Sequence, residues 1–251
     1  MYRAMNRWKA ASIHLTISLV LAASVAALLY FLWFPSPYFV AAGASRLILL
    51  LMGVDVCIGP LLTLVVVNPL KARKLLRLDL SFIGLLQAVA FGYGIHVIAS
   101  ARPVFIVAEI DRLVMVSAEQ LTDADLIKGS QPAYRSRSWT GPVFVGALPP
   151  KGDKAIGFAI QVMNGGKDID QLPQFYVPYD QVIDRVLHHA KPLAALKKVT
   201  PLQHEQLLRL QTGAAGQTLL ALPIVRGDKS YAGIIFPGKK RPAVVMSIDP
   251  W

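Results

Sequence analysis

Charged side chains are scarce in this sequence. Only 16% of the 251 residues are charged, whereas 54% are hydrophobic. Soluble globular domains carry about 25% charged residues, so the composition argues against a protein that is soluble along its whole length. Acidic residues are the scarcest, with 15 against 26 Lys and Arg. Before residue 104 only Asp55 and Asp79 are acidic.

Cysteine is nearly absent as well. Cys57 is the single cysteine, which excludes an intramolecular disulfide and a zinc site built from several cysteines. The histidines do not have metal-site spacing either. His188 and His189 are adjacent and point to different faces of a helix, and His204-Glu205 lacks the second histidine of a zinc-protease helix. We therefore expect no metal and no cofactor.

Motifs of the common enzyme classes are missing. The chain has no Gly-x-Ser-x-Gly nucleophile elbow. Gly165-Gly166-Lys167 is followed by Asp168 rather than Ser or Thr, and it lacks the earlier glycine of a P-loop. Gly92-Tyr93-Gly94 lies inside a hydrophobic run and is no dinucleotide-binding fingerprint. The sequence therefore predicts no enzyme and no catalytic or cofactor-binding residues.

The net charge of +11 raises the question of nucleic-acid binding. Many of the basic residues flank hydrophobic runs, where membrane topology accounts for them. Lys239-Lys240-Arg241 is typical of a turn between two strands. We therefore expect no nucleic-acid partner.

Three long apolar runs are present in the first hundred residues. They cover residues 10–34, 47–67 and 80–99, and each is long enough to cross a hydrocarbon core of about 30 Å. A signal peptide is the competing interpretation of the first run, because Ala42-Gly43-Ala44 resembles a cleavage site. The run exceeds a signal-peptide core of about 7–15 residues and ends in interface-type aromatic residues. We predict a retained transmembrane helix.

Basic residues around these runs predict the orientation. Three precede the first run, one lies in the first connector, and four lie in the second connector. By the positive-inside rule the N-terminus and the second connector are cytoplasmic. An odd number of spans then places residues 104–251 on the far side. We predict a multi-pass protein of the bacterial inner membrane, with a transmembrane region at 1–103 in the lipid bilayer and a periplasmic domain at 104–251.

Beyond Pro103 the hydrophobic pattern changes to short, β-branched runs. The fold class predicted is three N-terminal transmembrane α-helices followed by an extracytoplasmic α+β domain with mostly antiparallel strands. The predicted helices cover 118–127, 179–190 and 201–211. Residues 104–110 and 113–117 are predicted as one bent strand or as two strands around Asp111-Arg112. The other predicted strands cover 143–147, 155–162, 218–225, 230–236 and 243–248.

A carboxylate lies near the middle of the second run. An aspartate there costs roughly 2.5–3.5 kcal/mol on insertion scales, so Asp55 requires an explanation. With helical spacing, Asp55, Gly59 and Thr63 share one face, and Pro60 follows Gly59 directly. A proton or ion pathway is poorly supported, because a single acidic group makes no relay.

Small residues recur every four positions in the third run, at Gly84, Ala88 and Gly92. This small-xxx-small pattern lets helices approach closely. Two interpretations remain open. The small and polar faces of the second and third runs pack on each other, or part of them receives a helix from another protein.

Several of these stretches resemble one known family. Residues 54–69, VDVCIGPLLTLVVVNP, are similar to its VDxxxGPLLTLVVFNP segment, and residues 78–87 are similar to the start of its third span. Residues 101–113 resemble its ARPVxxVFxVDRF passage, with Leu113 where the family tends to have Phe. Residues 176–179 and 249–251 also fit. The sequence thus resembles the TfpX/TfpZ type IV pilin accessory proteins, which include FimB-like proteins.

The resemblance implies an inner-membrane protein that assists a particular major pilin toward stable accumulation and surface assembly. It carries no catalytic residues over. We expect a non-enzymatic chaperone or assembly factor whose partner is its cognate type IV major pilin. In this hypothesis the faces around Gly59 and Gly84 accept the apolar helix of pilin, while the periplasmic domain contacts the pilin head.

Arg102, Asp111 and Arg112 are expected at the junction between membrane and domain, either in a functional role or as local charge pairs. The alternative function is a membrane-anchored periplasmic enzyme that modifies pilin, for instance by transferring a glycan. A sensor is a third class, but cytoplasmic segments of roughly ten residues leave no room for an output domain.

Overall fold

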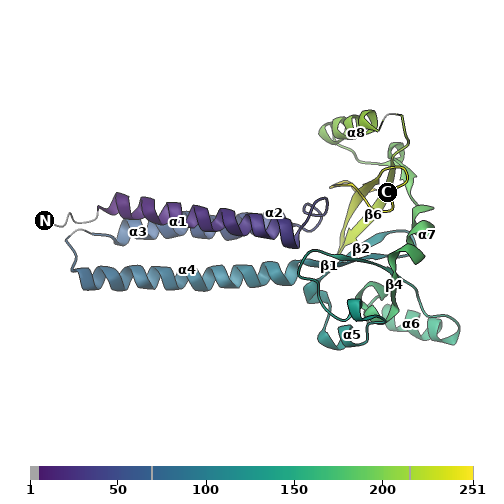
Figure 1. The fold of residues 1–251 in the computed structure, drawn as a ribbon, viewed down its shortest axis with the longest axis horizontal. Coiled ribbons are helices and arrows are strands. Elements are labelled where there is room, and N and C mark those ends of the chain that lie inside the picture. The colour runs from purple at the N-terminus through teal and green to yellow at the C-terminus, as the bar shows by residue number, and fades with distance from the viewer. Residues whose placement is uncertain (1–5, 69, 215, 251) are drawn as a thin grey trace. The chain divides into compact units, whose positions relative to one another are not determined.

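The chain divides into two compact units. The computed structural model describes residues 6–68, 70–214 and 216–250. The first unit comprises the described residues through Phe31 together with Gly43–Ser100, and the second comprises Leu32–Ala42 and the described residues from Ala101 onward (Figure 1). Leu32–Ala42, which the sequence pattern predicts only as a helix end and a connector, therefore belongs to the second unit.

Within the described residues, three helices are long and apolar enough to cross a membrane. They are Arg7–Trp33, Ala44–Val66 and Arg73–Ala101, in agreement with the three predicted runs. The first consists of α1 (Arg7–Leu28) and a π-helical end at Leu29–Trp33. The third is the continuous helix α4 (Arg73–Ala101). The predicted run covers only the uncharged residues 80–99, and α4 also includes basic residues ahead of Asp79.

The second span is interrupted by a π-helical turn. It runs from α2 (Ala44–Gly53) through the π-helical residues Val54–Ile58 into α3 (Gly59–Val66). Pro60 lies in the first turn of α3 and has no backbone N–H to donate to the residue four positions earlier. The hydrogen-bond ladder therefore widens immediately before the proline. Such π turns are frequent at functional sites, and this one carries Asp55.

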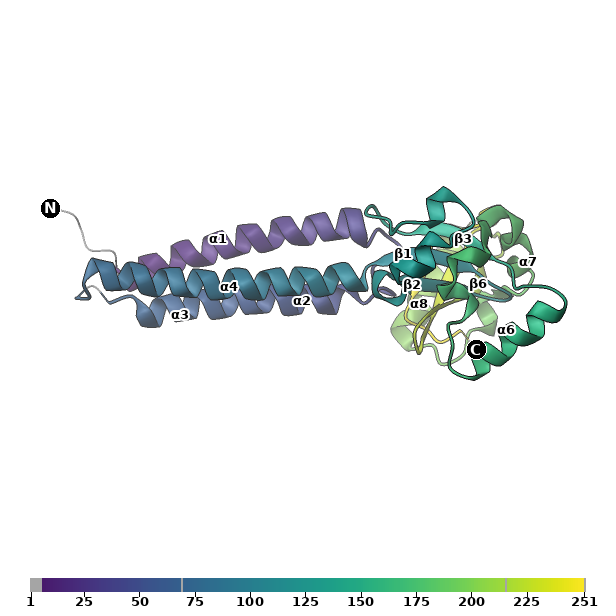
Figure 2. The ribbon, with the colours of Figure 1, turned by 90° about the horizontal axis from the view of Figure 1, so that it is seen from below.

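Small side chains let the helices of the first unit approach each other. The face of α1 that packs toward α3 has a small or polar residue at every fourth position: Ala10, His14, Ser18 and Ala22. Helix α4 runs alongside α1, α2 and α3 in both views (Figures 1 and 2). Its side-chain contacts with the second long helix include two at glycines. A Cβ atom at Gly59 would lie 2.0 Å from Nε2 of Gln87, and one at Gly94 would lie 2.4 Å from Cδ1 of Leu51.

One mixed sheet forms the centre of the second unit. Its order is β4-β3-β1-β2-β6-β7-β8, with β5 paired to β6. The strands are β1 (Pro103–Ala108), β2 (Leu113–Ser117), β3 (Val143–Ala147), β4 (Tyr176–Pro178), β5 (Lys191–Pro192), β6 (Leu220–Arg226), β7 (Lys229–Ile235) and β8 (Val244–Met246).

The expectation of mostly antiparallel pairing is corrected by the middle of this sheet. There β1 pairs with β3 in parallel and β2 pairs with β6 in parallel, whereas the hairpins β1–β2 and β6–β7 are antiparallel. Short turns in a sequence reveal hairpins between neighbouring strands. Parallel partners are joined by long crossovers, so the sequence pattern gave no sign of them.

The helices of the second unit differ from the prediction in one important place. Residues 155–162, predicted as a strand, lie within α6 (Asp153–Met163). Ile156, Ile160 and Met163 recur at helical spacing, and a short apolar run does not separate strand from helix by its pattern. The predicted helices at 118–127 and 179–190 are broken into short pieces that include α5 (Asp123–Ile127) and α7 (Ile183–Leu187). Helix α8 (Pro201–Gly213) agrees with its prediction.

Two hydrophobic clusters cover the sheet. The first surrounds β1 and β3 and includes Phe105, Val145 and Tyr176. The second joins α8 through Leu207 to Ala232 and Met246 at the other end of the sheet. All six residues of β1 are buried, because this strand lies in the interior of the sheet between β2 and β3.

The connector Leu32–Ala42 is held in the second unit by aromatic contacts. The ring of Tyr38 meets Phe144 of β3 edge to face with centroids 5.8 Å apart, and Phe144 meets Tyr179 in the same way at 5.3 Å. The guanidinium of Arg241 lies over the Phe144 ring, 4.2 Å from its centroid. Tyr38 and Phe34 are both buried. The connector thus supplies part of the hydrophobic interior of the second unit.

Substitutions at Tyr38 test this anchoring. Tyr38→Ala removes a buried aromatic ring and is expected to lower stability by about 3–5 kcal/mol. The Tyr38 hydroxyl is buried without a hydrogen-bond partner, a condition that costs about 1–3 kcal/mol. Tyr38→Phe should therefore keep or raise the unfolding temperature of the full chain, measured in detergent. Unchanged stability of Tyr38→Ala would contradict the anchoring.

Candidate functional site

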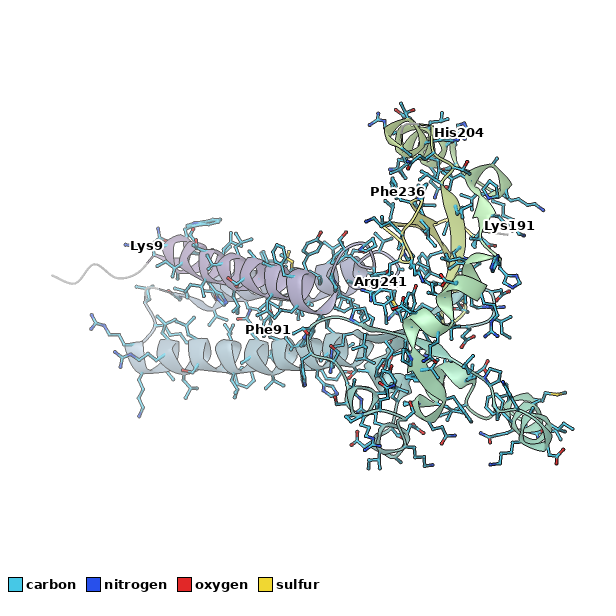
Figure 3. The ribbon with its side chains drawn as sticks, turned by 45° about the vertical axis from the view of Figure 1, so that its right-hand side comes forward. Lys9, Phe91, Lys191, His204, Phe236 and Arg241 are labelled. Carbon is cyan, nitrogen blue, oxygen red and sulfur yellow. The ribbon has the colours of Figure 1, made fainter. Side chains whose placement is uncertain are left out.

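A groove of about 300 Å³ runs between α1 and α4 in the first unit. Figure 3 labels Phe91, which lies on the side of α4 that faces α1. The groove is lined from α1, the π turn and α4 by His14, Ile17, Ser18, Leu21, Asp55, Gly84, Gln87, Ala88 and Phe91. Three residues singled out from the sequence, Asp55, Gly84 and Ala88, therefore meet at one site.

Asp55 is a buried acidic residue of this groove whose carboxyl oxygens have no hydrogen-bond partner among the described residues. Its side chain is 6% exposed. A buried polar group without a partner is uncommon in native structures and calls for an explanation. The backbone carbonyl of Asp55 does have a partner, because Gln87 Nε2 donates to it over 3.5 Å.

A second polar contact lies close to Asp55. His14 Nδ1 and Thr63 Oγ1 are 2.6 Å apart and join α1 to α3. Thr63 is almost fully buried, so this predicted residue packs inside the unit and does not line the groove. His14 was not among the site residues predicted from the sequence. Its signal was the spacing of four residues that it shares with Ser18 and Ala22.

The two predicted faces of small residues have different surroundings. Gly59 is covered by Gln87, and Pro60 is buried beside it. That face packs within the unit. By contrast, no atom lies within 4 Å of a Cβ placed on Gly84 or on Gly92. The face of α4 that carries Gly84 and Ala88 is open.

Arg102 is tightly enclosed at the start of β1. Its side chain is 5% exposed, and Nε donates to the carbonyl of Ser138 over 3.2 Å. The guanidinium lies over the rings of Trp139 and Trp33, 4.3 and 5.6 Å from the centroids. Burial lowers the pKa of this guanidinium. Trp33 belongs to the second unit, so all of these contacts lie within that unit.

Asp111 and Arg112 do not share that location. They form an exposed ion pair of 2.7 Å in the turn between β1 and β2. The six residues of β1 separate them from Arg102, a distance of about 20 Å at the usual rise per strand residue. The structure therefore does not bring the three predicted junction residues together. Asp111 and Arg112 satisfy each other locally.

Two carboxyl groups that no sequence motif singles out, the partly buried Glu109 and the buried Asp170, lie near this turn. Burial and the neighbouring Asp170 and Asp168 raise the pKa of Glu109 to about 8. Burial and Asp168 raise the pKa of Asp170 to about 6. Among the described residues, no group of three or more His, Cys, Asp or Glu side chains is arranged to hold a metal ion.

Comparison with known proteins gives consistent matches. A family model described as "Fimbrial assembly protein FimB" matches residues 2–43. The chain is 35% identical to "Fimbrial assembly protein, serogroup I" of Dichelobacter nodosus over 186 residues, which cover 74% of this chain and 72% of that protein. It is 34% identical over 186 residues, with the same coverage, to the serogroup E1 protein of that organism. No solved structure matches.

The carboxyl groups of Glu109 and Asp170 make stability depend on pH. An ordinary glutamate titrates near 4.3 when unfolded, whereas Glu109 in the folded chain titrates at about 8. The folded state binds more protons in between, so this contribution to stability is lost as pH rises from about 4 to 8. Asp170 acts in the same direction at lower pH.

Glu109→Gln removes the larger part of this dependence. We expect the unfolding temperature of the variant, relative to the original chain, to be higher at pH 8.5 than at pH 5.5. Glu119→Gln is the matched control, because Glu119 is exposed. A Glu109→Gln difference that stays constant across this range would contradict the raised pKa.

Proposed function

Because the chain belongs to the FimB family of fimbrial assembly proteins, we propose that it is a type IV pilin accessory protein of the bacterial inner membrane. It binds its cognate major pilin, stabilises it and hands it on for assembly into the pilus. Both of the similar Dichelobacter nodosus proteins are named fimbrial assembly proteins, which supports a role in pilus assembly. The three long apolar helices support membrane anchoring.

The open groove between α1 and α4 is the observation that carries this proposal. A pilin that waits in a membrane before assembly has an apolar helix that needs a neighbour. Gly84 and Ala88 leave the α4 backbone accessible, and small residues of this kind permit close packing of helices in lipid. We assign the groove to the pilin helix, and Gly59, Pro60 and Thr63 to packing within the accessory protein.

The second unit is assigned to the periplasm and to the pilin head. The support is the distribution of basic residues, which is densest before the first helix and ahead of α4. Three spans then put the sheet of the second unit on the far side of the membrane from the N-terminus. A partner with this layout can contact both the helix and the head of the same pilin.

We propose a binding role rather than a catalytic one. The support is the lack of recognisable catalytic motifs in the sequence. An enzyme that modifies pilin would change the mass of mature pilin. Mass spectrometry of pilin with and without this protein separates the two functions, because a mass difference would favour the enzyme.

Deletion of this protein tests the proposal at the level of the pilus. Pilin abundance and surface pili should be measured separately. Loss of pilin indicates a stabilising chaperone, and normal pilin without surface pili indicates an assembly factor. Normal amounts of both would contradict the proposed function.

Site-directed crosslinking tests the groove itself. A photo-reactive side chain at Ala88 should give adducts with the cognate pilin, because this position lines the groove. Val89 is the matched control, since it is exposed on the same helix one position further round. Equal pilin adducts from both positions, or none from Ala88 in well-expressed protein, would argue against the groove as the binding site.

A further inference from the structure

The carboxyl group of Asp55 has hydrogen-bonding capacity that the first unit does not use. Within the described part of that unit, its two oxygens are the buried side-chain atoms without a hydrogen-bond partner. A carboxyl in apolar surroundings is costly unless a donor meets it. Three polar residues of the neighbouring helices line the same groove, Ser18, His14 and Gln87, and none of them forms a hydrogen bond with the Asp55 carboxyl. Two of the three have other contacts.

His14 and Gln87 are those two groups. His14 contacts Thr63 through Nδ1, and the amide of Gln87 donates to the backbone carbonyl of Asp55. On its inner side Asp55 borders a cavity of only about 10 Å³, shared with Leu29, Ile48 and Phe91 among others. This volume is at the lower limit for one water molecule, and its lining is apolar.

On its other side Asp55 lines the groove of about 300 Å³ that is open along Gly84 and Ala88. A donor for Asp55 therefore has its room on the groove side. We infer that the helix which occupies this groove is apolar and carries a hydrogen-bond donor side chain that meets the Asp55 carboxyl. This inference rests on the proposed function, which assigns the groove to the pilin helix.

The pairing gives the groove selectivity as well as affinity. A donor in an apolar helix has no partner in lipid before binding, so both groups gain from the contact. An apolar helix without a donor would bury the Asp55 carboxyl still further and leave it unpaired. Binding sites usually reject analogues that lack a polar group for this reason, because a buried group of the site then has no hydrogen bond. Asp55 thus distinguishes the correct helix from the many apolar helices of a membrane.

Binding measurements test the inference. The full chain and its cognate major pilin, each carrying a fluorophore, are reconstituted in lipid vesicles, and energy transfer reports binding. Asp55→Leu should weaken binding about 3- to 30-fold, the range that interhelical hydrogen bonds contribute in membranes. Asp55→Asn keeps an acceptor oxygen and should bind more tightly than Asp55→Leu. Equal binding of Asp55→Leu and the original chain would overturn the inference.

Ala88→Trp separates this inference from the proposed function. The indole fills the groove and should abolish energy transfer with pilin. If Ala88→Trp loses pilin while Asp55→Leu binds normally, the groove assignment holds and the inference on the donor fails. If Ala88→Trp binds pilin normally, the groove assignment itself fails.

Stability measurements exclude a purely structural explanation. The Asp55 carboxyl has no hydrogen-bond partner to lose among the described residues, so Asp55→Leu should unfold at the same or a higher temperature than the original chain. Weaker pilin binding together with a lower unfolding temperature would overturn the inference, because misfolding would then account for the loss.

Substitutions in pilin identify the donor. Each donor side chain of the pilin helix is replaced by alanine in turn. One replacement should weaken binding as much as Asp55→Leu does, and the two changes together should weaken it no further. Fully additive effects for every donor would overturn the inference. The groove could instead bind a second copy of this chain. In that case energy transfer would occur between two copies, and both pilin and Ala88→Trp would abolish it. This result also overturns the inference.

Discussion

The packing of α4 in the first unit depends on two side chains that fill the space left by glycines, Gln87 beside Gly59 and Leu51 beside Gly94. The end of the Gln87 side chain lies close to where a Cβ atom of residue 59 would be, and the end of the Leu51 side chain lies close to where a Cβ atom of residue 94 would be. A larger residue at either glycine would force these side chains to move. Membrane helices gain little from apolar association in lipid, so such van der Waals contacts and a few hydrogen bonds hold them together. Helix α4 keeps an open face at Gly84 and Ala88, and this face lines the groove.

The same constraint explains why polar residues cluster at one level of the unit. The three long apolar helices all contribute to this cluster, with His14 from the first, Asp55 and Thr63 from the second and Gln87 from the third. Each of these residues has a polar group that apolar surroundings would leave unsatisfied. His14, Thr63 and Gln87 find contacts within the unit. Pro60 widens the helix immediately beside Asp55. Among the described residues of the first unit, the Asp55 carboxyl is the buried side-chain group left without a hydrogen bond. Our further inference depends on this carboxyl group.

Much of this architecture could be predicted from the sequence, and the remainder fails for physical reasons. Three apolar helices and the hairpins of the sheet follow from run length and period, and Gly84 and Ala88 follow from their spacing. The prediction of a strand at 155–162, where α6 lies, was wrong because short apolar strands and helices have similar sequence patterns. The parallel pairings join strands that are far apart in the chain, so local patterns do not predict them. The role of His14 follows only from its contact with Thr63, which requires the packed structure. Burial of Glu109 and Asp170 arises from tertiary packing, which no local pattern records.

The aromatic anchor at Tyr38 has a consequence for synthesis. Leu32–Ala42 leaves the ribosome before two further spans and well before β3 supplies Phe144. The second unit is therefore not a contiguous stretch of chain, and its interior is completed by a piece made much earlier. A fragment beginning at Ala101 would leave the Phe144 side of β3 without that piece. The second unit therefore completes its interior with residues that lie, in the chain, between the first two long apolar helices.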